Sequence, residues 1–230
     1  MRAVHWGAII VIILIGIVLL VTLNDSQFFL SPEIRNLTAV EVREYQGERL
    51  SSIADVRENA IHGLQKVDIS TYSLSVTGRV GKNTTYSYSD VLASFPHYRK
   101  VVTLYCVEGW NVRILWDGIL VSDLIDRAVP STGANIVIFR AVDGYSTSLP
   151  VEFIREHNIL LAYAMNNVTL PPERGFPFEI VAEDKWGYKY IKWVKEIELS
   201  EDASYRGYWE SRGYSQNGSL EKGYFDQGGF

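Results

Sequence analysis

The apolar positions of this chain follow two different patterns. Residues 3–23 are uncharged and almost continuously apolar, which is long enough to cross a hydrocarbon core of about 30 Å. The run ends on the bulky residues Val21-Thr22-Leu23, which do not suit a signal-peptidase site and favour a retained anchor over a cleaved signal. We therefore predict a transmembrane helix over residues 1–23.

Residues 24–45 show no sustained period, and we interpret them as a stalk or linker. Arg2 precedes the apolar run, whereas Asp25, Glu33 and Arg35 follow it. By the positive-inside rule this arrangement keeps the N-terminus inside and places the domain outside the cytoplasm. The expected localisation is the cell membrane, with a single pass and an extracytoplasmic domain.

Beyond residue 46, short apolar runs have the periods of strands and helices. Tyr72, Leu74 and Val76 alternate with polar residues, which predicts a half-buried strand. Lys195 interrupts the apolar face of the last predicted strand, so we expect a β-bulge or a sheet edge there. Further strands are predicted over residues 101–105, 135–142, 160–165, 177–182 and 190–199, and helices over residues 51–62, 87–95, 122–129 and 150–158. Short strands mixed with short helices indicate an α+β fold with mixed sheets.

Composition narrows the class of protein further. The chain has 230 residues and a formal net charge of −5, which predicts one folded domain with an ordinary core. Lys and Arg are scattered, so no basic patch indicates a nucleic-acid partner. We place the folded domain at residues 46–214 and expect residues 215–230 to form a loose C-terminal tail.

Cys106 is the single cysteine, so the chain has no intrachain disulfide. It follows the apolar run VVTLY, at the end of a predicted strand. Three interpretations are open: a small buried residue, a nucleophile, or a thiolate ligand for a soft metal. The four histidines show no recognisable partner motif for a nucleophile. As a metal ligand, a single cysteine would need a cofactor to complete the coordination.

Several blocks of the sequence favour the third interpretation. The stretch CVEGWNVRILWDGI (residues 106–119) resembles the molybdenum-binding segment of the sulfite oxidase superfamily, especially its periplasmic methionine sulfoxide reductase catalytic subunits. Similar blocks follow in the same order at residues 144–150, 159–166, 170–199 and 206–214. The resemblance implies a sulfite oxidase-type molybdopterin-binding domain preceded by the transmembrane helix.

The resemblance assigns roles to residues of this chain. Cys106 matches the thiolate ligand of a molybdenum held by one molybdopterin. The stretch Lys189, Tyr190, Ile191 and Lys192 matches the contacts to the pterin phosphate. Ala141 stands where the family has a threonine near the cofactor, so only its backbone is expected to serve.

Two departures from the family pattern change its charges. Glu179 stands where relatives have an arginine that binds the cofactor, and Arg174 is a candidate to replace that arginine. Arg113 stands where the methionine sulfoxide reductases have an aliphatic residue, and an arginine near the metal would clamp an oxyanion substrate. The alternative for Arg113 is a surface ion pair with Glu108 or Asp117.

The resemblance implies a membrane-anchored molybdenum oxidoreductase that transfers an oxygen atom to or from a small oxo-acid or sulfoxide-type substrate. The sequence has no Cys-x-x-Cys-His motif, so no haem is expected in this chain, and electrons would be exchanged with a separate, membrane-bound partner. The N-terminus has one arginine instead of the twin-arginine signal of exported relatives. Glu179 and this missing signal favour the alternative, a cofactor-free domain that acts as a cell-surface binding or interaction module.

Overall fold

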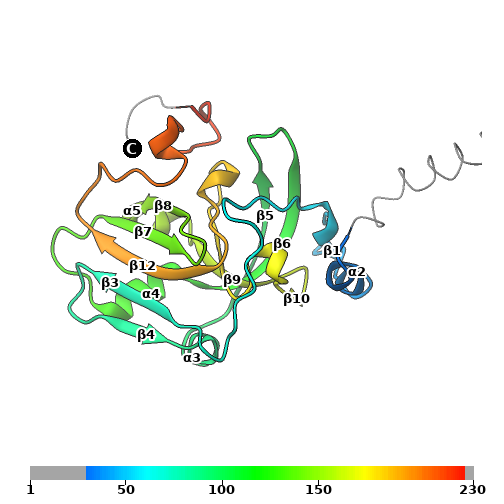
Figure 1. The fold of residues 1–230 in the computed structure, drawn as a ribbon, viewed down its shortest axis with the longest axis horizontal. Helices are drawn as coiled ribbons and strands as arrows, with labels where there is room; N and C mark the ends of the chain where they lie inside the picture. Colours follow the sequence, from blue (N-terminus) through cyan, green and yellow to red (C-terminus); the bar gives the residue numbers. More distant parts are fainter. Residues whose placement is uncertain (1–29, 226–230) are drawn as a thin grey trace, which may run out of the picture.

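A computed structural model describes residues 30–225, and these residues build two five-stranded sheets (Figure 1). In the first sheet β12 pairs in parallel with β3 and antiparallel with β7, so the sheet is mixed. Its strands, in spatial order, are β4 (Thr84–Tyr86), β3 (Leu74–Gly78), β12 (Val194–Ser200), β7 (Ile136–Ala141) and β8 (Ser146–Pro150).

The second sheet is antiparallel throughout and contains the hairpin that carries Cys106. Its strands are β10 (Val168–Thr169), β9 (Leu160–Met165), β6 (Asn111–Leu120) and β5 (Tyr98–Tyr105), with β11 (Glu179–Val181) paired to β9. The predicted strands therefore form, and the expected α+β fold with mixed sheets is confirmed.

Helices in the described part are short. The predicted helix near residues 87–95 is confirmed, because Ser87 and Asp90 form a capping box at the start of α3. The α-helices are α2 (Pro32–Thr38), α3 (Tyr88–Ser94), α4 (Val121–Ala128) and α5 (Val151–Glu156), and the 3-10 helices are η2 (Ile53–Asp55), η3 (Pro172–Arg174), η4 (Gly187–Lys189) and η5 (Glu210–Arg212).

The predicted helix over residues 51–62 is wrong. Ser52 and Asp55 cap each other's backbone N–H groups around the single turn of η2. The buried Glu41 carboxylate also accepts hydrogen bonds from the Ser52 hydroxyl (2.5 Å) and the Ile53 N–H (2.9 Å). After this turn Val56 is extended, so residues 56–61 run as an irregular segment.

The last predicted strand begins later than expected. Trp193 has a φ of +56°, which is incompatible with a continuous strand, and β12 starts only at Val194. The register between β12 and β7 shifts between Val194 and Glu196, which confirms a bulge at Lys195. The alternative of a sheet edge is wrong, because β12 lies between β3 and β7.

Both segments flanking the predicted domain pack against it. The predicted linker contains α2 and β1 (Glu44–Tyr45), which pairs with β2 (Glu48–Arg49) just beyond it. Glu41 of the linker accepts a hydrogen bond from Asn166 Nδ2 at 2.9 Å. On the C-terminal side Ser215 is buried, and the Trp186 N–H donates to the Gly218 carbonyl at 2.8 Å. Residues 215–225 are therefore ordered against the domain (Figure 1), which corrects the expectation of a loose tail over this range.

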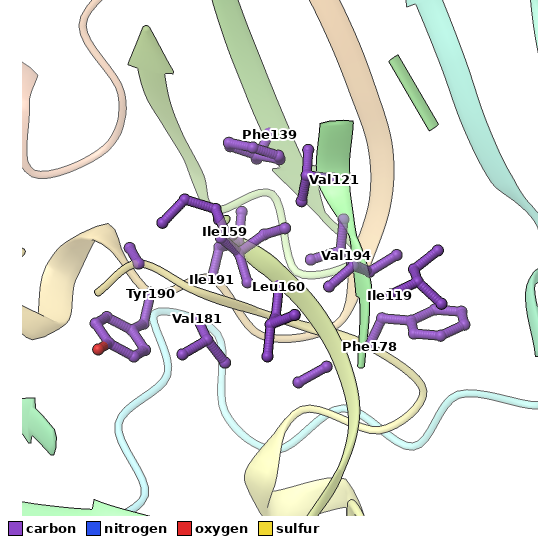
Figure 2. Packing of buried hydrophobic residues seen from close by; sticks show 14 of the residues in the cluster. Ile119, Val121, Phe139, Ile159, Leu160, Phe178, Val181, Tyr190, Ile191 and Val194 are labelled. Atoms are coloured by element: carbon purple, nitrogen blue, oxygen red, sulfur yellow. The ribbon is translucent and has the colours of Figure 1, made fainter. Parts of the chain in front are cut away.

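One apolar core joins both sheets. Figure 2 shows Val194 and Phe139 of the first sheet near Leu160 and Ile119 of the second, with Ile191 among them. Tyr190 lies at the margin of this cluster and its hydroxyl points away from the labelled apolar side chains.

Within residues 30–225, no helix has the length and apolar character needed to cross a membrane. The predicted span over residues 1–23 lies outside the described residues.

Candidate cofactor site

A cavity of about 370 Å³ lies where the end of β5 meets η3, η4 and the segment after η2. It is lined by Val56, Arg57, Asn59, Ala60, Ile61, Leu104, Cys106, Val107, Glu108, Trp110, Trp116, Asp143, Tyr145, Glu173, Arg174, Glu179, Gly187, Tyr188, Tyr190, Lys192, Trp193, Trp209 and Tyr214. One thiol, several charged groups and many aromatic rings thus share one cavity.

The β5–β6 hairpin fixes Cys106 in this wall. The Cys106 N–H bonds the Trp110 carbonyl at 2.9 Å, and the Gly109 N–H bonds the Cys106 carbonyl at 3.0 Å. Gly109 has a φ of +87°, which glycine adopts without strain. On the other side η4 approaches so closely that a Cβ on Gly187 would lie 3.5 Å from the Cys106 Cα. The thiol is therefore held between two tight backbone turns.

The groups around Cys106 shift the pKa of its thiol in opposite directions. Burial raises the pKa of the thiol above its usual value, and the nearby Glu108 carboxylate acts in the same direction. Hydrogen bonds from the backbone N–H groups of Glu108 and Val107, together with the charge of Arg57, lower it. Without a cation at the sulfur the buried thiol is favoured, so a bound metal ion would be the main force that deprotonates it.

Cationic side chains line another part of the cavity. The Arg174 side chain is buried, and its Nε donates to the Ile53 carbonyl at 3.1 Å. The Lys192 Nζ donates to Glu58 Oε1 at 3.2 Å and lies 4.3 Å from the centre of the Trp193 ring. Burial lowers the pKa of both groups, and the surrounding glutamates oppose this shift.

Glu179 is buried beside these cations. Burial raises the pKa of its carboxyl to about 8, although Lys192 and Arg174 both act to lower it. Arg174 does not point to solvent, so the proposed exchange of the family arginine for Arg174 remains compatible with the structure.

Some polar atoms in the cavity wall have no partner. Within residues 30–225, the Tyr190 hydroxyl, Trp116 Nε1 and Glu173 Oε2 are buried and form no hydrogen bond. Such atoms are costly in a folded protein unless a ligand or water completes them. The wall is therefore built for a polar occupant.

The structure brings only half of the predicted site residues to this cavity. Cys106, Arg174, Tyr190 and Lys192 line it, whereas Ile191 lies in the core and Ala141 ends β7 without lining the cavity. Lys189 also lies elsewhere, because its fully buried Nζ bonds Glu210 Oε1 at 2.7 Å and the Ser148 carbonyl at 3.0 Å.

Arg113 is a correction to the sequence prediction. Its Nη1 pairs with Glu48 Oε2 at 2.9 Å, both side chains are about half exposed, and it does not line the cavity. Val112 and Ile114 on either side of it are buried, so the alternation along β6 turns Arg113 to the opposite face. The surface ion pair is thus the interpretation that the structure shows, with Glu48 as the partner.

Other lining residues were missed from the sequence. Arg57 and Asn59 lie in the segment that the sequence predicts as a helix, and Trp209 and Tyr214 come from the far end of the chain. The aromatic motif around residues 206–214 was a usable signal for the last two, but no local pattern marks Arg57 or Asn59.

The residues present fit an anionic cofactor that carries a phosphate and a metal. A soft thiolate ligand, the cations Arg57, Arg174 and Lys192, and unpaired buried polar atoms share one cavity. Within the described residues, no group of three or more His, Cys, Asp or Glu side chains is placed to hold a metal ion. Cys106 is therefore the protein ligand that this cavity offers.

Comparisons with known proteins agree with this chemistry. A model of the oxidoreductase molybdopterin-binding domain matches residues 61–209. The uncharacterized oxidoreductase YuiH of Bacillus subtilis is 34% identical over 152 residues, covering 66% of this chain and 76% of the relative. The structure of the sulfane dehydrogenase SoxCD from Paracoccus pantotrophus matches with a TM-score of 0.62 and 17% identity, over 84% of this chain and 57% of that one, which supports the fold.

Two further relatives have names that specify a reaction. The putative protein-methionine-sulfoxide reductase subunit YedZ1 of Azospira oryzae is 29% identical over 68% of this chain. The protein-methionine-sulfoxide reductase catalytic subunit MsrP of Campylobacter jejuni is 26% identical over 70% of this chain, and in both cases the match spans 60% of the relative. The family match over residues 61–209 confirms the resemblance predicted from the sequence, and this chain belongs to the oxidoreductase molybdopterin-binding domain family.

Proposed function

We propose that this protein holds a molybdenum cofactor through Cys106 and performs two-electron oxygen-atom transfer on a small oxo-acid or sulfoxide-type substrate. The observation that carries the proposal is the position of the only cysteine, in the wall of a cavity that also contains three cationic side chains. The family match and the relatives named as methionine sulfoxide reductases support the same reaction class.

When bound, the cofactor supplies the oxygen-atom and electron chemistry, and the protein supplies binding and orientation. Cys106 provides the thiolate that fixes the metal in the cavity. Lys192 and Arg174 bind the anionic part of the cofactor, and the unpaired Tyr190 hydroxyl and Trp116 Nε1 offer it hydrogen bonds.

The remaining wall suits the substrate. Arg57 is the cation whose charge acts on the Cys106 thiol, so it is placed to attract the oxygen of an oxo substrate near the metal ligand. Trp110, Trp209 and Tyr214 add aromatic surface, which favours the carbon and sulfur atoms of a sulfoxide.

The proposal extends to location and partners. The apolar run over residues 3–23 anchors the protein in the cell membrane, with its domain outside the cytoplasm. A separate electron-transfer protein in the same membrane would serve as the electron partner of this protein. Relatives named as reductase subunits support a partner of this kind.

The test is the molybdenum content of the full chain, purified from a host that makes molybdopterin. We expect near-stoichiometric metal in the wild type, almost none in Cys106→Ser, and wild-type content in Arg113→Ala, whose side chain lies outside the cavity. A well-folded wild type without molybdenum would overturn the proposal. That outcome would favour the cofactor-free binding module.

A further inference from the structure

Glu179 lies at a convergence of three backbone segments in the cavity wall. It begins β11, and Gly175 brings the turn after η3 against it. A Cβ on Gly175 would lie 3.1 Å from the Lys192 Cβ and 3.2 Å from the Glu179 Cβ. The Glu179 carboxyl and the Lys192 ammonium therefore belong to one cluster, together with Arg174.

The cations of this cluster already have other partners. Lys192 Nζ bonds Glu58 Oε1, and Arg174 bonds the carbonyls of Ile53 and Glu173. The Glu179 side chain lines the cavity, and Lys192 and Arg174 are the charged groups that act on its carboxyl. An ionised Glu179 is thus buried while the cations near it are bonded to other groups, which is an expensive state.

A phosphate makes this arrangement worse if Glu179 stays ionised. Two anions in one buried cluster repel each other strongly, because the low dielectric screens them little. A protonated carboxyl removes the repulsion and also offers an O–H donor, which forms a short and strong hydrogen bond to an anionic oxygen. Protonation therefore lets a glutamate occupy the place of a phosphate-binding arginine.

We propose that Glu179 is protonated when the cofactor is bound and donates a hydrogen bond to its phosphate, so that cofactor binding takes up a proton at every pH at which the free carboxyl is ionised. This inference rests on the proposed cofactor site. It makes Glu179 a binding residue with a neutral, donating form, and the cofactor affinity falls as the pH rises.

The surrounding groups set the sign and the pH range of the effect. Burial holds the pKa of Glu179 at about 8, so above this pH the free protein must acquire the proton in order to bind. Arg174 and Lys192 oppose protonation of Glu179, whereas a bound phosphate favours it. Glu58 raises the pKa of both cations and Glu173 that of Arg174, and Tyr190 stays neutral because burial raises its pKa. The affinity is therefore expected to fall by up to about tenfold for each pH unit above 8.

The test is a competition for one cofactor between two proteins. Wild-type holoprotein is mixed with an excess of tagged apo Glu179→Gln at pH 7 and at pH 9, and molybdenum and pterin are measured in each protein at equilibrium. The glutamine is neutral at both values, so the variant lacks the titration of Glu179, while the titrations of Cys106 and the phosphate are common to both proteins. We expect the partition to move toward Glu179→Gln by about tenfold at pH 9.

A matched competitor, Glu183→Gln, controls for the loss of a carboxylate near the same strand, since Glu183 pairs with Lys100 and does not line the cavity. Its partition is expected to be independent of pH. A constant ratio for Glu179→Gln would overturn the proton linkage and leave the proposed function intact. A wild type that carries no molybdenum would overturn both.

A second measurement needs only the wild type and applies if Glu179→Gln does not fold. Apo wild type is loaded with metal-free molybdopterin in weakly buffered solution at pH 8.5, so that no metal deprotonates Cys106. Proton uptake of more than half a proton per bound cofactor supports the inference. No uptake, or proton release, overturns it.

Discussion

Lys189 and Lys192 are three residues apart in one motif, yet the structure gives them opposite environments. Lys189 is completely buried and pairs with Glu210, whose side chain is equally buried. Lys192 lines the cavity, its side chain is 17% exposed, and it pairs with Glu58 from an irregular segment. Lys189 is thus fully enclosed by protein, whereas Lys192 is accessible and can change its partner when a ligand binds.

The difference comes from the turns on either side of Tyr190. Lys189 ends η4 and points toward η5 and the Ser148 carbonyl, whereas Lys192 precedes the positive φ of Trp193 and faces η3 and β11. Buried charges need complete partners inside the protein, while a binding site keeps charges that a ligand can complete. We therefore propose that Lys189 stabilises the fold and that Lys192 binds the cofactor, and the following predictions test this division.

The largest loss of stability is expected when the buried ion pair of Lys189 and Glu210 is broken. In Lys189→Met the Glu210 carboxylate stays buried, and among residues 30–225 the Thr147 hydroxyl, at 2.6 Å, is its remaining side-chain donor. Removing one member of a buried ion pair typically costs about 3–5 kcal/mol. Urea unfolding of the full chain in mild detergent measures this loss.

The double variant Lys189→Met/Glu210→Leu is the control for the same pair. Replacing both charges by apolar groups removes the uncompensated carboxylate, so we expect it to recover most of the stability. A loss below about 1 kcal/mol in Lys189→Met would contradict the structural role, because that is the range of exposed pairs.

The cavity cluster predicts a pH-dependent stability of the apoprotein. Burial raises the pKa of Glu179 from 4.5 to about 8, so the folded state binds more protons than the unfolded state between these values. Stability is then lost as the pH rises, on the order of 3 kcal/mol between pH 5 and pH 8, since one pKa unit corresponds to about 1.4 kcal/mol. Glu179→Gln should remove this slope.

The measurement compares the unfolding free energies of apo wild type and apo Glu179→Gln at several pH values. The two curves should lie close together near pH 4.5 and diverge up to pH 8, with the variant more stable. Parallel curves would show that Glu179 ionises in the folded protein as it does in solvent.

Lys192→Met tests whether Lys192 binds the cofactor. Loss of one charge-assisted contact to a phosphate costs about 1.5–3 kcal/mol, which corresponds to roughly a 10- to 100-fold weaker hold on the cofactor. The variant's share of molybdenum in competition with wild-type apoprotein reports this change, while its unfolding free energy should change much less than that of Lys189→Met. Equal shares would contradict the binding role of Lys192.

Local patterns in the sequence predicted the helices and strands of this fold better than the surroundings of individual charged side chains. The alternation around Leu74 and the capping box at Ser87 specify β3 and α3 because these signals act over a few residues. The bulge at Lys195 was also visible, since one polar residue broke an apolar face. Strand alternation across Arg113 contained the information that it faces away from the core.

The remainder depended on partners distant in sequence. Glu210 is 21 residues from Lys189, and Glu58 is 134 residues from Lys192, so no local pattern separates the two lysines. The helix predicted over residues 51–62 is wrong for the same reason. Its apolar residues have helical spacing, but Ser52 and Asp55 close one turn and the buried Glu41 binds it, after which Val56 extends toward the cavity.

Arg113 provides the smallest expected effect and a reference for the other charges. Its pair with Glu48 is half exposed on both sides, so solvent screens the attraction and the side chains lose entropy when they pair. Arg113→Ala should therefore lower the unfolding free energy by only about 0.2–1 kcal/mol and leave the molybdenum content unchanged. If the metal content stays constant but oxygen-atom transfer falls strongly, Arg113 acts on the substrate after all. Unchanged activity would instead exclude Arg113 from the reaction and leave Arg57, Arg174 and Lys192 as the cations that line the cavity.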